Sequence, residues 1–165
     1  PVVMPLNTIH LRRTVDTLEQ AILHLQALPV ERTDAASVSR DTKPGSSVTA
    51  DGVLYDLYRN AAIKSFELSL ETAGKLLRKA LKPYAVQPRE VDRLVFNDVL
   101  RQAGKHGLLE IDEVSRWLKY RANRNTTAHD YGEDFANETM KLLPAYLQDA
   151  RALADRLDEA ANATP

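Results

Sequence analysis

Residues 54–81 read LYDLYRNAAIKSFELSLETAGKLLRKAL, a stretch without proline in which apolar residues recur at helical spacing. The apolar positions are Leu54, Leu57, Ala61, Phe66, Leu68, Ala73, Leu76, Leu77 and Ala80. Such spacing places apolar side chains on one side of an α-helix, where they pack against other elements. The stretch predicts a long helix from about Leu54 to Leu81 that ends before Pro83.

The sequence before this stretch predicts another helix and then a loop. Over residues 7–28, apolar residues alternate in four- and three-residue steps, which is the pattern of a narrow helical seam. Asn7 or Thr8 can cap the start of this helix, and Pro29 stops it. Residues 29–52 are rich in Ser, Thr, Asp, Pro and Gly, which predicts a flexible surface loop without a function of its own.

Two more helices are expected directly after the long one. The first covers about residues 89–103, and Gly104 or Gly107 can end it because glycine tolerates the left-handed conformation that closes a helix. The second begins with Asp112 as its capping residue and carries Trp117, which we expect in the core.

The final helix covers about residues 133–159, where Pro144 indicates a kink or a restart. No strand pattern competes with the helical ones. The sequence thus predicts an all-α protein, an up-and-down bundle of about five helices that forms a single domain over residues 1–165. The seams of the first and last helices serve either packing within the chain or dimerisation, and periodicity does not separate these two.

The composition excludes several classes of protein. The chain has no cysteine, so it holds neither a disulfide framework nor a thiolate metal site. No apolar run is long enough to span a membrane, and no signal-peptide pattern opens the sequence, so we expect a cytoplasmic protein. With 22 basic and 23 acidic side chains the net charge is −1, so any contact with nucleic acid depends on a local basic patch.

Such a patch lies between residues 116 and 131. It holds Arg116, Lys119, Tyr120, Arg121, Arg124, His129 and Tyr131. Guanidinium groups bind phosphates bidentately, and tyrosines stack on unpaired bases. Arg116, Lys119 and Arg121 are therefore candidate RNA contacts, although a solvated helix face explains Lys119 equally well. Asn125 is expected to support the site by orienting the chain through hydrogen bonds.

Residues 124–131, RNTTAHDY, match the Arg-x4-His-x-Tyr motif of HEPN domains. The sequence most resembles the branch known as nucleotidyltransferase substrate-binding proteins, whose long helix tends to carry an aromatic–Glu pair, here Phe66-Glu67. A further similarity is the apolar turn that leads from Gly107 to the helix with Trp117. The resemblance covers about two-thirds of the chain and leaves out the 29–52 loop.

The resemblance implies a dimeric helical bundle encoded beside a minimal nucleotidyltransferase (MNT) that acts as its antitoxin. Many HEPN proteins are ribonucleases in which the Arg and His of both protomers meet in a cleft at the dimer interface. Where the motif ends in Tyr, the nucleotidyltransferase can transfer AMP to that tyrosine. Carried over by position, Arg124 and His129 become catalytic and Tyr131 becomes the AMPylation target of a type II toxin.

The residue types suit RNA cleavage without a metal or cofactor. Histidine titrates near neutral pH and can act as general base or general acid. Such catalysis typically raises the reaction rate about 10²–10⁴-fold. Arginine stays charged and fits the phosphate oxygens. On an unbroken helix, Arg124 and His129 would point about 140° apart and lie about 7.5 Å apart along the axis. We therefore expect the helix to end between them, or two protomers to combine their motifs.

Two other functions use the same residues. A non-catalytic subunit that presents a nucleotide or polyanion to the nucleotidyltransferase would need the same arginines, and a plain helical scaffold is the third interpretation. Glu67 and Glu71 share a helix face beside Lys64 and Lys75, which indicates an ion-paired surface, with the orientation of a motif arginine as the alternative.

The remaining histidines, His10, His24 and His106, have no acidic or histidine neighbours at metal-ligand spacing. We interpret them as structural or exposed, and no catalytic metal is expected.

Overall fold

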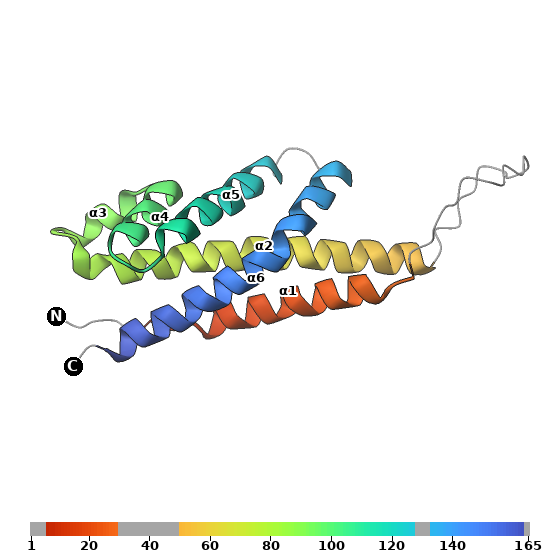
Figure 1. Cartoon of the computed structure of the whole chain (residues 1–165), viewed down its shortest axis with the longest axis horizontal. Helices are drawn as coiled ribbons and strands as arrows, with labels where there is room; N and C mark the ends of the chain where they lie inside the picture. Colours follow the sequence, from red (N-terminus) through yellow and green to blue (C-terminus); the bar gives the residue numbers. More distant parts are fainter. Residues whose placement is uncertain (1–5, 30–49, 128–132, 164–165) are drawn as a thin grey trace, which may run out of the picture.

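The computed structural model describes residues 6–29, 50–127 and 133–163, and these residues contain helices and no strand. In chain order the elements are α1 (Ile9–Ala27), α2 (Ala50–Leu81), the 3-10 helix η1 (Lys82–Tyr84), α3 (Pro88–Arg93), α4 (Phe96–Lys105), α5 (Ile111–Thr127) and α6 (Glu133–Asn162). Helices α1, α2 and α6 are the long elements and contact one another, while α3, α4 and α5 lie along the other side of α2 (Figure 1). The all-α bundle predicted from the sequence is confirmed.

Helix α1 begins and ends close to where the sequence predicts. The Oδ1 atom of Asn7 accepts a hydrogen bond from the backbone N–H of Ile9 at 3.0 Å. Thr8 occupies the capping position, but its hydroxyl donates to Asp158 of α6 at 2.7 Å instead. Both expected residues therefore act at this helix end, one by capping and one by joining it to the end of α6.

Helix α2 begins at Ala50, so the predicted loop over 29–52 extends too far; residues 30–49 of it lie outside the described residues. Likewise, α6 continues through Pro144 to Asn162 without the restart that the proline suggested. A single missing N–H is tolerated because the neighbouring turns pack on both sides against the core.

The single helix predicted over 89–103 is wrong, because α3 and α4 are separate. Leu94 and Val95 have extended backbone conformations, with ψ of 138° and 156°. The carbonyl of Val91 at the end of α3 accepts a hydrogen bond from the side chain of Arg78 at 3.0 Å. The break turns the chain so that Phe96 lies against α2, a tertiary contact for which the local sequence gives no signal.

The start of α5 also differs from the prediction. The helix begins at Ile111, so Asp112 lies in its first turn and is not the cap. The carboxylate of Glu113 accepts the backbone N–H of Glu110 at 3.0 Å, which is the reciprocal half of a capping box. Before it, Gly107 has a φ of 74° and closes α4, as the sequence predicted for one of the two glycines.

An aromatic cluster forms the centre of the core between α2, α5 and α6. The rings of Phe66, Trp117, Tyr120 and Tyr146 meet edge to face at centroid distances of 4.8–5.7 Å. Ser69 and the hydroxyl of Tyr146 share a hydrogen bond of 2.6 Å inside the cluster. The core position predicted for Trp117 is confirmed, since this side chain is fully buried.

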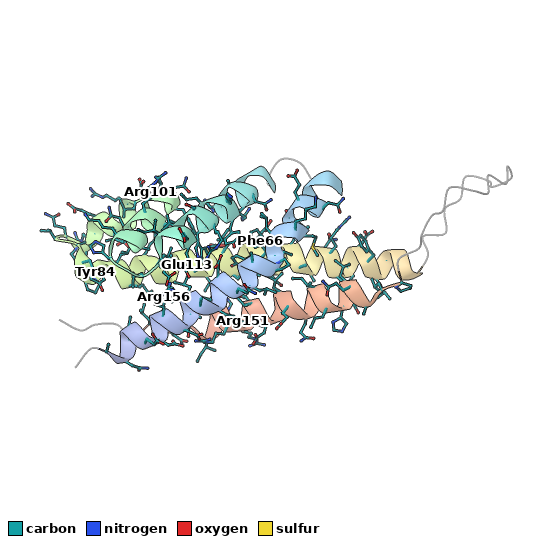
Figure 2. All side chains as sticks on the ribbon, in the orientation of Figure 1. Phe66, Tyr84, Arg101, Glu113, Arg151 and Arg156 are labelled. Atoms are coloured by element: carbon teal, nitrogen blue, oxygen red, sulfur yellow. The ribbon has the colours of Figure 1, made fainter. Side chains whose placement is uncertain are left out.

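Ion pairs fix α6 to its neighbours around this core. Arg156 of α6 donates to Glu113 of α5 at 2.8 Å and also to the carbonyl of Leu108 (Figure 2). Arg151, one turn earlier, pairs with Glu19 of α1. No described helix is long and apolar enough to cross a membrane.

Candidate functional site

The structure describes part of the Arg-x4-His-x-Tyr segment. Arg124 stands in the last turn of α5, which ends at Thr127. His129 and Tyr131 lie outside the described residues, and Asn125 is described only in its backbone. The prediction that the helix ends between Arg124 and His129 stays a prediction, because residues 128–132 lie outside the described residues.

Arg121 and Arg124 of α5 line a pocket of about 320 Å³ together with residues of α2 and α4. We call it the basic pocket; its lining is Glu67, Leu70, Glu71, Gly74, Lys75, Arg78, Phe96, Arg121 and Arg124. Four cations and two carboxylates thus face one hollow. Lys75 and Arg78 enter it from α2. The sequence-based interpretation placed Lys75 only in a surface ion pair and gave Arg78 no role; their helical spacing puts both on the face of Glu71, but it does not show what that face packs against.

Arg121 is held in the basic pocket by a stack of groups. Its guanidinium carbon lies 4.8 Å from the centroid of the Phe96 ring, within the range of a cation–π contact. The ring in turn lies on α2 at Gly74, where an added Cβ would come within 2.3 Å of Phe96 Cε2. Only glycine therefore lets the ring approach α2 this closely. The same ring makes the cation–π contact that positions the Arg121 guanidinium.

The cations of the basic pocket repel one another. The pKa of Arg121 lies below its ordinary value, first because of burial and then because of the positive charges of Arg124 and Arg78. Arginine remains protonated at neutral pH despite such a shift. An anion bound in the pocket would offset both the burial of the Arg121 charge and the repulsion between the cations. It would pair with the desolvated guanidinium and reduce the local positive charge.

The acidic residues of the basic pocket balance part of this charge. Glu67 Oε1 lies 3.9 Å from Arg124 Nη1 and Glu67 Oε2 lies 3.8 Å from Lys64 Nζ, while Glu71 pairs with Lys75 at 3.4 Å. Such long, partly exposed pairs contribute about 1 kcal/mol or less. Glu67 thus belongs to an ion-paired surface and also lies beside a motif arginine. These contacts correspond to the two interpretations that the sequence left open for the glutamates.

Arg116 lies in a different environment from Arg121 and Arg124. Its guanidinium forms a two-pronged ion pair with Asp149 of α6, with Nε–Oδ2 and Nη2–Oδ1 distances of 2.8 and 2.9 Å. The hydroxyl of Tyr120 donates to the same carboxylate at 2.6 Å, and burial followed by this bond raises the pKa of Tyr120. Arg116 therefore joins α5 to α6, and Lys119 is exposed outside the lining of the basic pocket.

The arrangement suits the binding of a phosphate group. Guanidinium and ammonium groups from two helices converge on a space that admits a phosphate and its ester substituents. In the described ranges, no group of three or more His, Asp or Glu side chains is placed to hold a metal ion.

Comparison with known proteins finds a family, a curated relative and solved structures of the same fold. Residues 9–159 match the family described as nucleotidyltransferase substrate binding protein like. A protein of Haemophilus influenzae named probable ribonuclease HepT is 29% identical over 105 residues, which are 64% of this chain and 70% of that protein.

Two solved structures share the fold. A Haemophilus influenzae structure described as a substrate binding domain of a nucleotidyltransferase has a TM-score of 0.69 at 23% identity, over 92% of this chain and 98% of that one. A crystal structure of a Thermus thermophilus protein has a TM-score of 0.52 at 27% identity, over 85% of this chain and 98% of the other. These similarities agree with the resemblance found in the sequence.

Proposed function

This chain belongs to the nucleotidyltransferase substrate binding protein like family, and we propose that it is a metal-independent endoribonuclease, the toxin of a bacterial type II toxin–antitoxin pair. The observation that carries the proposal is the basic pocket, where Arg121 and Arg124 meet Lys75 and Arg78 beside the end of α5. His129 follows the last residue of α5 by two positions in the sequence. Two cations of the basic pocket and a histidine therefore come from one short stretch of the sequence, residues 121–129.

In this function Arg124 and Arg121 hold the scissile phosphate and stabilise the negative charge of the phosphorane. His129 accepts the proton of the 2′-hydroxyl, and the 2′-oxygen attacks the phosphorus. The 5′-oxygen leaves after it receives a proton. The products are a 2′,3′-cyclic phosphate and a 5′-hydroxyl. Because each chain has one histidine in the motif, a homodimer in which the second protomer supplies the acid completes the reaction.

Control of the toxin is proposed to come from a nucleotidyltransferase antitoxin that transfers AMP to Tyr131. The added phosphodiester places a negative charge and a nucleoside two positions from His129 in the sequence. An anion tethered at this distance would compete with RNA for the cations of the basic pocket.

A second candidate function is a non-catalytic subunit that binds a nucleotide or polyanion for a nucleotidyltransferase. The family description and the description of the Haemophilus influenzae structure favour it. The same pocket would hold the phosphates of a nucleotide without any need for His129. The two functions therefore differ in their dependence on this histidine.

The test is RNA cleavage by the purified protein in EDTA, with end-labelled single-stranded RNA. We expect cleavage with 5′-hydroxyl ends and a loss of at least about 10²-fold in Arg124→Ala and His129→Ala. Arg13→Ala is the matched control, because Arg13 is an exposed arginine of α1 remote in sequence from the motif. Nucleotide binding without cleavage, unchanged in His129→Ala, would support the binding subunit; 5′-phosphate ends would contradict the mechanism.

Control by AMP transfer is tested by intact mass after expression with and without the nucleotidyltransferase encoded nearby. We expect the mass of one AMP per chain, its absence in Tyr131→Phe, and loss of cleavage in the modified sample alone. A modified protein that still cuts RNA at the full rate would reject this form of control while leaving the nuclease proposal intact.

A further inference from the structure

A second pocket, of about 210 Å³, lies where the end of α2, η1, α3 and α4 meet. Leu81, Val91 and Leu94 give it apolar walls, and Tyr84 and His106 contribute aromatic rings. We call it the aromatic pocket. It is smaller than the ~300–1,000 Å³ typical of pockets for drug-sized molecules. Its size and its lining suit a single planar ring system.

The two aromatic rings of this pocket are already stacked. The ring centroids of Tyr84 and His106 are 4.6 Å apart, with an angle of 19° between the ring planes. Tyr84 remains 53% exposed at this end of the molecule (Figure 2), so its ring is accessible to a ligand. Parallel, accessible rings are the surfaces on which proteins stack unpaired bases, histidine and tyrosine included.

Two polar side chains of the aromatic pocket complete the requirements for a base. Within the described part of the chain, neither the Glu90 carboxylate nor the Gln102 amide forms a hydrogen bond or ion pair with another residue. The carboxylate accepts hydrogen bonds, and the amide both donates and accepts them. Together they can pair with the mixed donors and acceptors on the edge of a nucleobase.

The surroundings of the aromatic pocket are basic. Residues 78–106 contain seven Lys and Arg against three Asp and Glu, a net charge of +4 in a chain whose total is −1. The seven cations are Arg78, Lys79, Lys82, Arg89, Arg93, Arg101 and Lys105. A local excess of this size attracts a polyanion even though the whole molecule does not.

Arg78 connects this pocket to the basic pocket. Its side chain lines the basic pocket, and its Nη1 atom donates to the carbonyl of Val91, which lines the aromatic pocket. Arg78 therefore contacts residues of both pockets. A strand that places a phosphate in the basic pocket would pass along Arg78 to bring a base to the aromatic pocket.

We propose that the aromatic pocket binds one unpaired base of single-stranded RNA, stacked on the Tyr84–His106 pair and held at its edge by Glu90 and Gln102. The proposal rests on RNA being the substrate of the basic pocket. It adds a base-binding subsite, which would make the choice of cleavage position depend on the sequence near the cut.

The test measures the affinity of the full-length chain for a single-stranded RNA with 2′-O-methyl sugars, which cannot be cleaved, and for an abasic oligonucleotide of equal length. Tyr84→Ala is expected to weaken RNA binding about 5- to 100-fold, because one base–aromatic stack is lost. Its affinity for the abasic oligonucleotide and the dependence of RNA binding on salt are expected to stay unchanged, because no phosphate contact is removed.

Two variants control for other causes. Tyr84→Phe keeps the ring and should bind RNA like the wild type. Tyr55→Ala removes another exposed tyrosine, near the opposite end of α2, and should have no effect. Equal RNA affinity of Tyr84→Ala and wild type would overturn the base subsite, as would an equal loss on the abasic oligonucleotide.

A titration with free nucleosides separates this proposal from the nuclease proposal. Adenosine, guanosine, cytidine and uridine lack phosphate, so they cannot use the basic pocket. At least one of them is expected to shift the imidazole proton resonances of His106, and the shift should vanish in Tyr84→Ala. A protein that cuts RNA without these effects would keep the nuclease proposal and lose the subsite. A protein that shows these nucleoside effects but does not cut RNA would keep the subsite and lose the nuclease proposal. Tyr84→Ala changing only the oligomeric state would assign the pocket to a protein contact and overturn the subsite.

Discussion

At the scale of single residues, the arginines of the predicted basic patch over residues 116–131 differ in the contacts that they make. Arg116 is paired with a buried carboxylate, whereas Arg121 rests on the face of the Phe96 ring and lines the basic pocket. A cation–π contact fixes the position of a guanidinium without using its hydrogen-bond donors. Arg121 is therefore better placed than Arg116 to bind a phosphate.

Replacing Phe96 tests this role of the ring. In Phe96→Leu the Arg121 guanidinium loses its support, and RNA affinity should fall about 2- to 5-fold, the value of an exposed cation–π contact. Phe96→Tyr keeps the ring face and should bind like the wild type. The rate of cleavage at saturating RNA should change little, because Arg121 keeps its charge. A fall in the saturated rate with unchanged affinity would show that Phe96 acts through the fold instead.

At the scale of elements, the sequence predicted the long helices and the class of fold because their apolar spacing is a local property. It failed at the break between α3 and α4, where Leu94 and Val95 carry no proline or glycine signal. It also missed Lys75 and Arg78 in the site, since nothing in a single helix shows which face meets another helix. Arg124 of the motif lies beside a cluster of cations, and only the packing of α2, α4 and α5 shows that they form a pocket.

The close approach of α4 to α2 depends on Gly74. In an isolated helix, Gly→Ala stabilises by about 1 kcal/mol. In this protein we expect Gly74→Ala to destabilise by about 1–2 kcal/mol, since the new Cβ would overlap the Phe96 ring. Urea unfolding measures the difference. In a Phe96→Leu background the same change should become neutral or stabilising, and destabilisation of equal size in both backgrounds would place the cause elsewhere.

The ends of α1 and α6 should respond to acid through Asp158. Hydrogen bonds from Arg12 and Thr8 lower the pKa of this carboxyl below its usual value. As the pH falls, the Asp158 carboxyl therefore binds a proton in the unfolded chain before it does so in the folded protein. The stability that ionised Asp158 contributes is present above about pH 4 and is lost below it. Asp158→Asn should cost about 1 kcal/mol or less at pH 7 and nothing near pH 2. A cost that did not depend on pH would exclude the charge as its source.

At the scale of the whole molecule, the chain combines a total charge of −1 with a local excess of Lys and Arg in the segments that form the two pockets. Binding of RNA would therefore be steep in salt although the protein is nearly neutral, because only the local cations release counterions. The single histidine of the motif raises the remaining question of how acid and base are both supplied, and a two-fold dimer would answer it.

Mixing two inactive variants tests whether the site combines residues of two protomers. In a two-fold dimer of Arg124→Ala with His129→Ala, one composite site loses both groups and the other keeps both. Random pairing of equal amounts then restores some activity, at most about one quarter of the wild-type value, because the restored site still lacks the acid that the replaced histidine would supply. If each site uses Arg124 and His129 of the same chain, every site in the mixture lacks one group and no activity returns. Native mass spectrometry resolves the mixed dimer from the two parent dimers by its intermediate mass and confirms that the subunits have exchanged, so that a lack of activity can be assigned to the architecture of the site.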